Sequence, residues 1–507
     1  MGDQSSNSKS KLNSLTIPLL DSTNDRSDQC SGIGIEKQSN LKEITMSEAL
    51  ISIYKQSIYP IIGLIAHSLY SIQNAVMLGN MESMDSTGKV ITSNNALAAY
   101  GIGTMTTSAI LFATGYTFNS YLGTLVSQAY GQMEYRLCAL YLNRQIYLNI
   151  VIYLPFIIPI LLSERFYLFV GIDGEIAHLA GTYCILNLPA HLIMNISNCY
   201  TRYLAGQREV KIGMYSNIIS AIIYAPVAYF FVIYLNQGLY GCAYSINVFF
   251  LSRLITQHIF IHNTKYRKQL ISLFDQDNFI LLLPQFKSSF NSAFMGIWSW
   301  WAFDIFTFIA SFLTTDQMAA QTICRSIGLI FFMIPLGVSQ ASGVLVGNQI
   351  GAQNVQGARM LINMTVLTGF LWGMFNILIM FTLKEQIIHL FSSSESVNTY
   401  IVEIFKIFSI FVFVDCLQYS AIGIIAGLGK QAVCSWITLL GFWGVGIPTS
   451  LIYVFYFNGG LFGIQFGQIL AVGTTMMFYF YIIHKSDLKL IGEQAFMRKF
   501  KEKKIPQ

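Results

Sequence analysis

Long apolar stretches alternate with short polar segments along most of the chain. A helix needs roughly 20 mostly apolar residues to cross a bilayer, and each of the twelve stretches meets that length. Their approximate limits are 54–79, 96–120, 137–162, 178–203, 211–235, 239–262, 288–313, 318–343, 360–383, 398–427, 432–457 and 460–484. The pattern therefore predicts an all-α polytopic membrane protein with twelve transmembrane helices.

The composition supports this prediction. Of the 507 residues, 54% are hydrophobic and only 11% are charged, whereas a soluble domain carries about 25% charged residues. The net charge of +5 does not indicate a nucleic-acid partner, because the basic residues gather at the ends of the stretches. No Gly-x-x-x-x-Gly-Lys-[Ser/Thr] motif is present, so we expect no bound nucleotide. The eight cysteines include no Cys-x-x-Cys pair and mostly lie in apolar stretches, which predicts buried thiols and no metal site.

Charges in the short loops predict the orientation of the chain. Basic residues dominate every second loop, and acidic residues dominate the others. Because short cytoplasmic loops carry the excess of Lys and Arg, both termini are predicted to be cytoplasmic. The basic loops include Arg136, Arg144, Arg202, Arg208, Lys265, Lys268, Arg359 and Lys430.

The two halves of the chain resemble each other at an offset of about 220 residues. Gly123–Gly131 recurs as Gly343–Gly351, and Pro226 recurs as Pro448. Two copies of six spans keep the same orientation, which predicts parallel lobes related by an axis along the membrane normal. The predicted parts are a disordered cytoplasmic tail (1–48), a first lobe (50–263), a cytoplasmic linker (264–287), a second lobe (288–485) and a cytoplasmic C-terminal tail (486–507).

Four charged residues lie within apolar stretches, all in the second half: Asp304, Arg325, Lys406 and Asp415. Ionisable groups at membrane depth are costly and usually face a cavity or a partner. Lys406 follows Glu403 by about one helical turn, which favours a local ion pair. We find no comparable charge in the first half, and we predict that the proton-coupling site lies in the second, with Asp415 and Asp304 as candidates.

Asp304 and Arg325 are predicted to form an ion pair. They lie about ten and eight residues from the outer ends of consecutive antiparallel spans, roughly 12–15 Å deep at 1.5 Å per residue. An unpaired Arg at that depth would be costly, so an opposite charge is its natural partner. The pair would keep Asp304 ionised and leave Asp415 as the titrating acid. Alternatively, Arg325 reaches the outer surface and Asp304 bonds a hydroxyl.

Several motifs together resemble the multidrug and toxic compound extrusion (MATE) family, eukaryotic type, over about residues 50–485. They are Gln128-Ala129-Tyr130-Gly131, Pro335-x-Gly337, Val346-Gly347-Asn348-x-x-Gly351-Ala352, Trp300-Trp301-x-Phe303-Asp304 and Asp415-x-x-Gln418. The resemblance implies two six-helix lobes around a V-shaped cavity. It also implies cation-coupled antiport of small organic molecules, often organic cations, with protons as the usual coupling ion.

The chain departs from the family pattern at four positions. Ser299 stands where eukaryotic members usually have Glu, and Arg325 where some animal members carry Glu. Leu345 replaces a usual Arg, and Asn74 falls where many bacterial members have Asp. The loss of two acids, with a basic residue at one position, weakens the expectation of an organic-cation substrate.

The candidate substrate-binding residues are Trp300, Gln321, Arg325, Gln418, Tyr419 and Asn74. Gln418 and Tyr419 lie near the helix face of Asp415, although a packing role suits Gln418 equally well. Trp300 suits a cationic ligand but also suits a core or lipid-facing position.

The sequence thus favours a secondary transporter that exports small organic molecules or xenobiotics in exchange for protons by alternating access. A related flippase for lipid-linked or amphipathic substrates is the main alternative, and a membrane-embedded enzyme would need a catalytic constellation that we do not find. We expect a monomer without cofactors, in the plasma membrane or in a vacuolar or other endomembrane.

Overall fold

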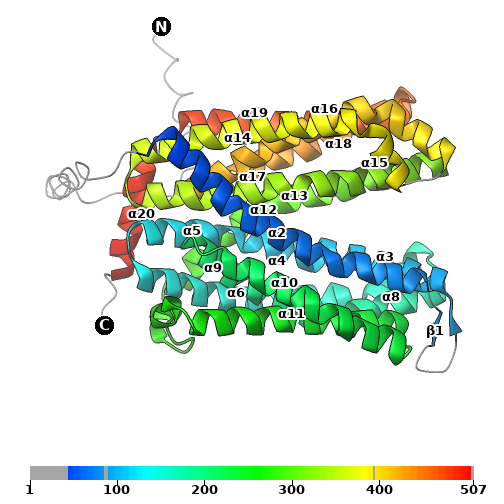
Figure 1. The fold of residues 1–507 in the computed structure, drawn as a ribbon, viewed down its shortest axis with the longest axis horizontal. Helices are drawn as coiled ribbons and strands as arrows, with labels where there is room; N and C mark the ends of the chain where they lie inside the picture. The colour runs from blue at the N-terminus through cyan, green and yellow to red at the C-terminus, as the bar shows by residue number, and fades with distance from the viewer. Residues whose placement is uncertain (1–43, 81, 85–89, 392–393, 504–507) are drawn as a thin grey trace, which may run out of the picture. The chain divides into compact units, whose positions relative to one another are not determined.

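The computed structural model describes residues 44–80, 82–84, 90–391 and 394–503, and these are almost entirely helical (Figure 1). The predicted N-terminal tail lies outside the described residues up to residue 43. The end of the predicted tail is helical instead of disordered, because the first helix begins at Met46, directly after the capping residue Thr45, which forms a capping box with Glu48. One short ladder is present among the described residues: β1 (Ser83–Met84) pairs antiparallel with β2 (Val90–Ile91).

The N-lobe is formed by the helices of the first half of the chain, followed by a linker with two short 3₁₀ turns. Its elements are α2 (Met46–Gly79), α3 (Ser93–Thr107), η1 (Ser108–Phe112), α4 (Ala113–Phe118), α5 (Ser120–Gly131), α6 (Tyr135–Leu161), α7 (Ser163–Val170), α8 (Gly174–Leu186), α9 (Leu188–Gly206), α10 (Lys211–Ala228), η2 (Tyr229–Tyr234) and α11 (Gly238–His262). The linker holds η3 (Lys265–Gln269) and η4 (Gln276–Asn278).

The C-lobe is formed by the helices of the second half. Its elements are α12 (Leu282–Ala310), α13 (Thr315–Gly351), α14 (Val355–Thr382), α15 (Lys384–Phe391), α16 (Glu395–Leu428), α17 (Gln431–Leu439), η5 (Leu440–Gly446), α18 (Ile447–Leu451), η6 (Ile452–Tyr456) and α19 (Gly460–Lys485). A last helix, α20 (Leu488–Lys503), occupies most of the predicted C-terminal tail.

The twelve predicted spans correspond to long helical segments. In the described part of the chain, nine helices are long and apolar enough to cross a membrane, or ten if the bent pair α8 and α9 is one span. The helices α11 and α16, of 25 and 34 residues, complete the twelve. Helices are the expected solution, because hydrocarbon offers no partner for backbone N–H and C=O groups, which a helix satisfies internally.

The internal repeat is visible in the backbone conformation. Non-glycine residues rarely adopt a positive φ, yet such residues recur at the offset of the sequence repeat. Asn236 and Asn458 both have φ of 51°, and Met133 and Gln353 have φ of 62° and 59°. The π-helical segments η2 and η6 also occupy corresponding places, after Pro226 and Pro448. The two lobes therefore share local geometry as well as sequence.

The lobes meet closely at the end of the bundle that carries the basic loops. Gly131 lies against the backbone carbonyl of Asn348, and Gly351 lies against that of Gln128, so the repeated motifs contact each other reciprocally. Thr124 also donates to the carbonyl of Ala426 at 2.6 Å. At positions 131 and 351 only glycine lets the two backbones approach so closely. The bundle is therefore closed at this end.

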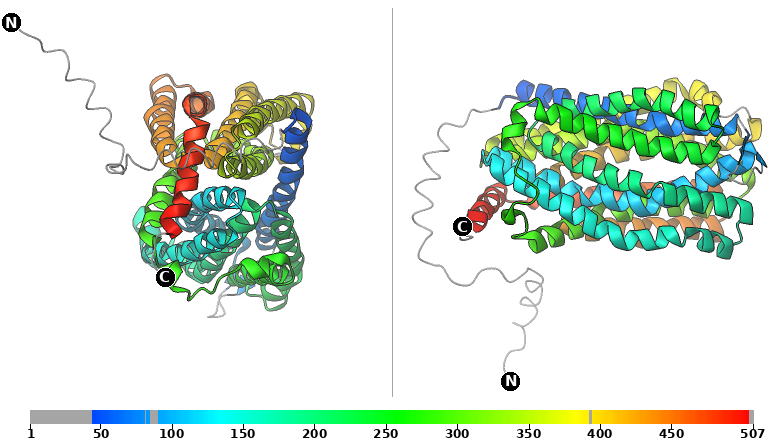
Figure 2. Two further views of the ribbon diagram at one scale, coloured as in Figure 1. Left: turned by 90° about the vertical axis from the view of Figure 1, so that its left-hand side faces the viewer. Right: turned by 90° about the horizontal axis from the view of Figure 1, so that it is seen from below.

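Helix α20 crosses the same end from the C-lobe to the N-lobe (Figure 2, left). Its buried residues Leu488 and Ile491 pack in a core cluster with C-lobe helices. On the other side Arg498 donates to the side chain of Gln128 at 2.8 Å, and Lys499 forms an ion pair with Glu134. The helix thus connects the two lobes where they are closed.

The orientation can be tested by cysteine labelling, because Glu82 and Lys268 are exposed at opposite ends of the bundle. We predict that an impermeant maleimide added to intact cells labels Glu82→Cys and leaves Lys268→Cys unlabelled until the membrane is permeabilised. Labelling of position 268 but not of position 82 from outside would reverse the orientation.

The reciprocal glycine contact predicts a position-specific effect on stability. A methyl group at Gly351 would overlap the backbone of Gln128, so Gly351→Ala should destabilise the protein by about 1–3 kcal/mol. The matched control is Gly473→Ala in α19, where a methyl group would meet nothing within 4 Å and where the higher helix propensity of Ala gives up to about 1 kcal/mol of stabilisation. Apparent melting temperatures of the purified variants in detergent measure both; equal melting temperatures would contradict the close approach.

Candidate functional site

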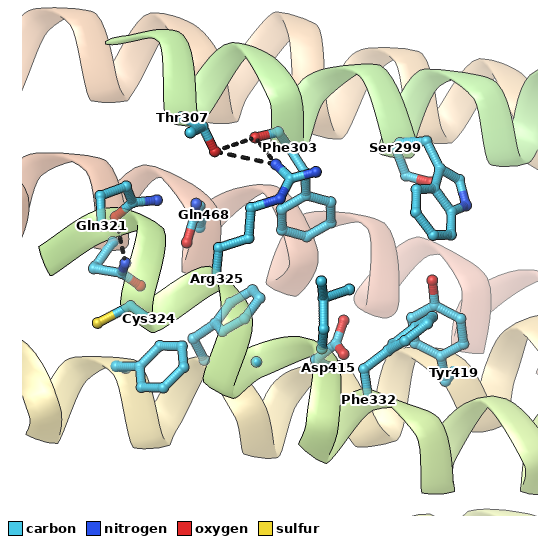
Figure 3. Close-up of a pocket in the computed structure, with 16 residues that line it drawn as sticks. Ser299, Phe303, Thr307, Gln321, Cys324, Arg325, Phe332, Asp415, Tyr419 and Gln468 are labelled. Atoms are coloured by element: carbon cyan, nitrogen blue, oxygen red, sulfur yellow. Dashed lines mark hydrogen bonds between the residues drawn. The ribbon is translucent and has the colours of Figure 1, made fainter. Parts of the chain in front are cut away.

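A cavity lies in the C-lobe between α12, α13, α16 and α19 (Figure 3). Its wall is mostly aromatic and apolar, with a few polar groups that converge on the hollow. The lining residues are Ser299, Trp300, Phe303, Thr307, Gln321, Cys324, Arg325, Gly328, Leu329, Phe332, Phe408, Phe411, Asp415, Tyr419, Gln465 and Gln468. This combination of an apolar wall and few polar groups is typical of small-molecule sites.

Arg325 and Asp304 form the predicted ion pair. Arg325 Nη2 donates to Asp304 Oδ1 at 2.6 Å, and both side chains are about a quarter exposed, at 27% and 26%. Arg325 Nη1 also donates to the carbonyl of Phe303 at 2.6 Å and to Thr307 Oγ1 at 3.1 Å. The short turn between α12 and α13 makes these helices antiparallel neighbours, which brings the two charges to one depth. The guanidinium group is thus tied to α12 by three hydrogen bonds.

Asp415 is buried and has no such partner. Its side chain is 8% exposed and lines the cavity from α16. Among the described residues it forms no hydrogen bond and no ion pair, in contrast to Asp304. Its neighbours in the cavity wall include Phe332 and Tyr419, whose rings pack edge to face at 4.6 Å (Figure 3). The carboxyl group of Asp415 therefore lines the cavity without an ion pair to neutralise it.

Three further candidates line the same cavity. Trp300 packs edge to face against Phe332 at 6.4 Å and against Phe112 of the N-lobe at 5.7 Å. The Gln321 side chain accepts a hydrogen bond from Gln465 at 3.0 Å. Together with Tyr419, these residues contribute aromatic rings and an amide group to the cavity that Asp415 also lines.

Two candidates lie away from this cavity. Gln418 donates to Thr475 on α19 and is absent from the cavity wall. Asn74 is fully buried in the N-lobe, where it accepts a hydrogen bond from Tyr224. Lys406 also differs from expectation: both Lys406 and Glu403 are exposed, and no ion pair joins them among the described residues.

The expectation that charges at membrane depth occur only in the second half is wrong. Arg253, in the middle of α11, is 5% exposed and donates to Asn198 and Thr201 at 3.2 Å. Arg202, in the last turn of α9, lies over the ring of Tyr116 at 5.1 Å rather than in a loop. The sequence did carry a signal for Arg253, since it interrupts an apolar stretch as Arg325 does.

These arginines line a second hollow between α2, α4, α9, α10 and α11. A third hollow between the lobes shares Trp300 and Tyr419 with the C-lobe cavity. It also shares Tyr116 and Arg202 with the N-lobe hollow. The third hollow therefore lies next to both of the others.

Within the described residues, no group of three or more His, Cys, Asp or Glu side chains is arranged to hold a metal ion.

Comparisons with known proteins agree with this architecture. The family model MatE matches residues 72–230 and 292–452, one match in each lobe. Multidrug and toxin extrusion protein 2 of Mus musculus is 25% identical over 439 residues, which are 85% of this chain and 73% of that protein. Protein DETOXIFICATION 26 of Arabidopsis thaliana is 28% identical over 406 residues, 75% of this chain and 81% of that protein.

The crystal structure of the eukaryotic MATE transporter AtDTX14 has the same fold, with a TM-score of 0.82 at 19% identity over 89% of this chain and 99% of that chain. The repeat, the cavity between paired lobes and the family match in each lobe lead to one assignment. The chain belongs to the MATE family of integral membrane transporters.

Proposed function

We propose that the protein is a proton-coupled antiporter that exports small organic molecules by alternating access. The observation that carries the proposal is Asp415, a buried carboxyl group without a partner among the described residues, in the wall of a cavity lined by aromatic and polar side chains. The names of the relatives, multidrug and toxin extrusion protein and DETOXIFICATION, support export of foreign compounds.

Asp415 would couple the two movements because a proton and a substrate compete for the same group. A carboxylate in a low-dielectric wall needs a partner for its charge. Either a proton neutralises it or a bound polar molecule interacts with it. One proton that moves across 100 mV supplies roughly 2.3 kcal/mol. One titrating carboxyl group is therefore sufficient to drive export against a concentration gradient.

The Arg325–Asp304 pair would have a different role. The pair neutralises itself, and its hydrogen bonds to the carbonyl of Phe303 and to Thr307 tie α13 to α12. We infer that it fixes the outer part of the cavity and keeps the guanidinium away from Asp415. An unpaired Arg325 would otherwise hold Asp415 ionised and prevent proton exchange.

Alternating access would require the closed end to open. In the present conformation the reciprocal contacts of Gly131 and Gly351 and the helix α20 close the end with the basic loops. We propose that this end is cytoplasmic, that the cavity here faces outward, and that the protein acts as a monomer in the plasma membrane or an endomembrane. Aromatic rings and a few polar groups line the cavity, and such a lining suits a small organic molecule.

Asp415, the proposed coupling group, can be tested by substitution. In proteoliposomes with an imposed pH gradient, Asp415→Asn should abolish concentrative uptake of a probe that the wild type accumulates, because the amide cannot exchange a proton. Tetraethylammonium and naphthalene-2-sulfonate together cover both charges of substrate. The purified variant should retain its melting temperature within a few degrees, since the substitution removes no hydrogen bond.

The matched control is Glu403→Gln, an exposed carboxyl group on the same helix, which should transport like the wild type. Concentrative uptake by Asp415→Asn would assign coupling to another residue.

The Arg325–Asp304 ion pair can be tested by single and double substitutions. Removal of one partner leaves an uncompensated charge, which destabilises a protein by about 3–5 kcal/mol when the pair is fully buried. Because this pair is partly exposed, the loss of stability should be smaller. Asp304→Asn and Arg325→Gln should each lower expression and transport, and the double variant should recover much of the loss. Strictly additive losses in melting temperature would show that the two residues act independently.

A further inference from the structure

We infer that the N-lobe hollow is a binding site for the anionic group of an organic anion, recognised by Arg202 and Arg253. The inference names a substrate class and rests on the proposed transport function. Arg253 is the starting point, because a guanidinium group that is 5% exposed in a membrane helix requires compensation for its lost hydration.

The structure provides Arg253 with only neutral partners. Its Nη2 atom donates to Asn198 and Thr201, both at 3.2 Å, and its Nε atom has no hydrogen-bond partner. No carboxylate lies within ion-pair distance among the described residues, whereas Arg325 in the other lobe has Asp304. The charge of Arg253 is thus held in place by the helix α9 but not neutralised.

Arg202 adds a second uncompensated guanidinium group to the same hollow. It lies over the ring of Tyr116 at 5.1 Å and forms no hydrogen bond or ion pair with the described residues. The stacked ring supports the planar group while its N–H donors stay free, as in sites where Arg receives a carboxylate, sulfonate or phosphate.

The remaining wall fits an organic anion with an aromatic or other flat body. The rings of Phe112 and Tyr116 stack at 5.3 Å and both line the hollow. The wall therefore offers flat aromatic faces beside the two guanidinium groups.

The charge balance of the wall favours an anion over a cation. The hollow has one carboxylate, Glu209, against the guanidinium groups of Arg202 and Arg253, so its charged lining is net positive. In the C-lobe cavity, by contrast, Arg325 and Asp304 cancel and Asp415 remains. An anion would thus bind in the lobe opposite to the titrating acid, and the hollow between the lobes has lining residues in common with both sites.

The experiment compares two probes that share a naphthalene body and carry head groups of opposite charge, naphthalene-2-sulfonate and naphthalen-2-yl-trimethylammonium. Binding to the full-length protein in lipid nanodiscs is measured by equilibrium dialysis without any gradient. The wild type should bind the sulfonate at least about tenfold more tightly than the ammonium compound, because one hydrogen bond to a charged group changes an affinity by about tenfold or more. Tighter or equal binding of the ammonium compound would overturn the inference.

Variants locate the site. Arg202→Gln and Arg253→Gln should each weaken sulfonate binding about tenfold and leave ammonium binding unchanged or stronger, and Arg253→Lys should recover much of the loss because it keeps the charge. The control Arg359→Gln removes an exposed arginine of α14 and should bind both probes like the wild type. If Arg253→Gln does not fold, Arg202→Gln decides, because Arg202 has no hydrogen bond to lose. Unchanged sulfonate affinity in a folded Arg202→Gln would refute the site.

The outcome is separable from that of the proposed function. Arginine-dependent sulfonate binding without any pH-driven transport would leave the anion site standing and reject the antiporter. Transport of a probe driven by the pH gradient, together with an unchanged sulfonate affinity in folded Arg202→Gln, would leave the antiporter standing and reject the anion site.

Discussion

An ionised side chain inside a bilayer must face an opposite charge, polar partners or a hollow, because hydrocarbon cannot solvate it. The charged groups of this protein show all three arrangements. Arg325 and Asp304 pair with each other, Arg253 receives neutral partners from α9, and Asp415 faces a cavity. The hollows and the helix packing around them are arranged so that these few charges are tolerated at membrane depth. The charges that remain uncompensated are the ones we assign to proton and substrate.

The repeat explains why two such sites can exist in one chain. Both lobes inherit the same helix order, the same positive-φ turns and the same glycine motifs, so each lobe surrounds a hollow of its own. The side chains that line the hollows have diverged. The N-lobe hollow carries Arg202 and Arg253, and the C-lobe cavity carries Asp415. A symmetric scaffold with asymmetric charges thus gives the two lobes different linings, net positive in the N-lobe hollow and acidic at Asp415 in the C-lobe cavity.

The sequence predicted those features that depend on one helix or on two consecutive helices. Apolar length located the spans, and the rise per residue placed Asp304 and Arg325 at one depth, because a short turn fixes the antiparallel register of their helices. Positions that depend on how a helix is rotated in the bundle could not be predicted. Gln418 shares the helix of Asp415 but points to Thr475, and Asn74 points to Tyr224.

The N-lobe site was missed for two different reasons. Arg253 interrupts an apolar stretch, as Arg325 does, so the sequence contains a signal for it. Its hydrogen-bond partners lie on α9, however, and the spacing of residues along the chain does not predict which side chains of another helix it contacts. Arg202 was interpreted as a loop charge that sets orientation, whereas α9 continues far enough to turn it toward Tyr116. Helix α20 was likewise predicted only as a tail, since it is stabilised by contacts with both lobes and has weak apolar periodicity of its own.

The central claim is that protons and substrate move in opposite directions through one protein. It is tested most directly by substrate-driven proton movement in proteoliposomes that start with equal pH on both sides, with the membrane potential clamped at zero and a pH-sensitive dye inside. An outward gradient of a transported probe should acidify the lumen in the wild type and not in Asp415→Asn. A wild-type protein that releases the probe along its gradient with no change in lumenal pH would contradict proton antiport.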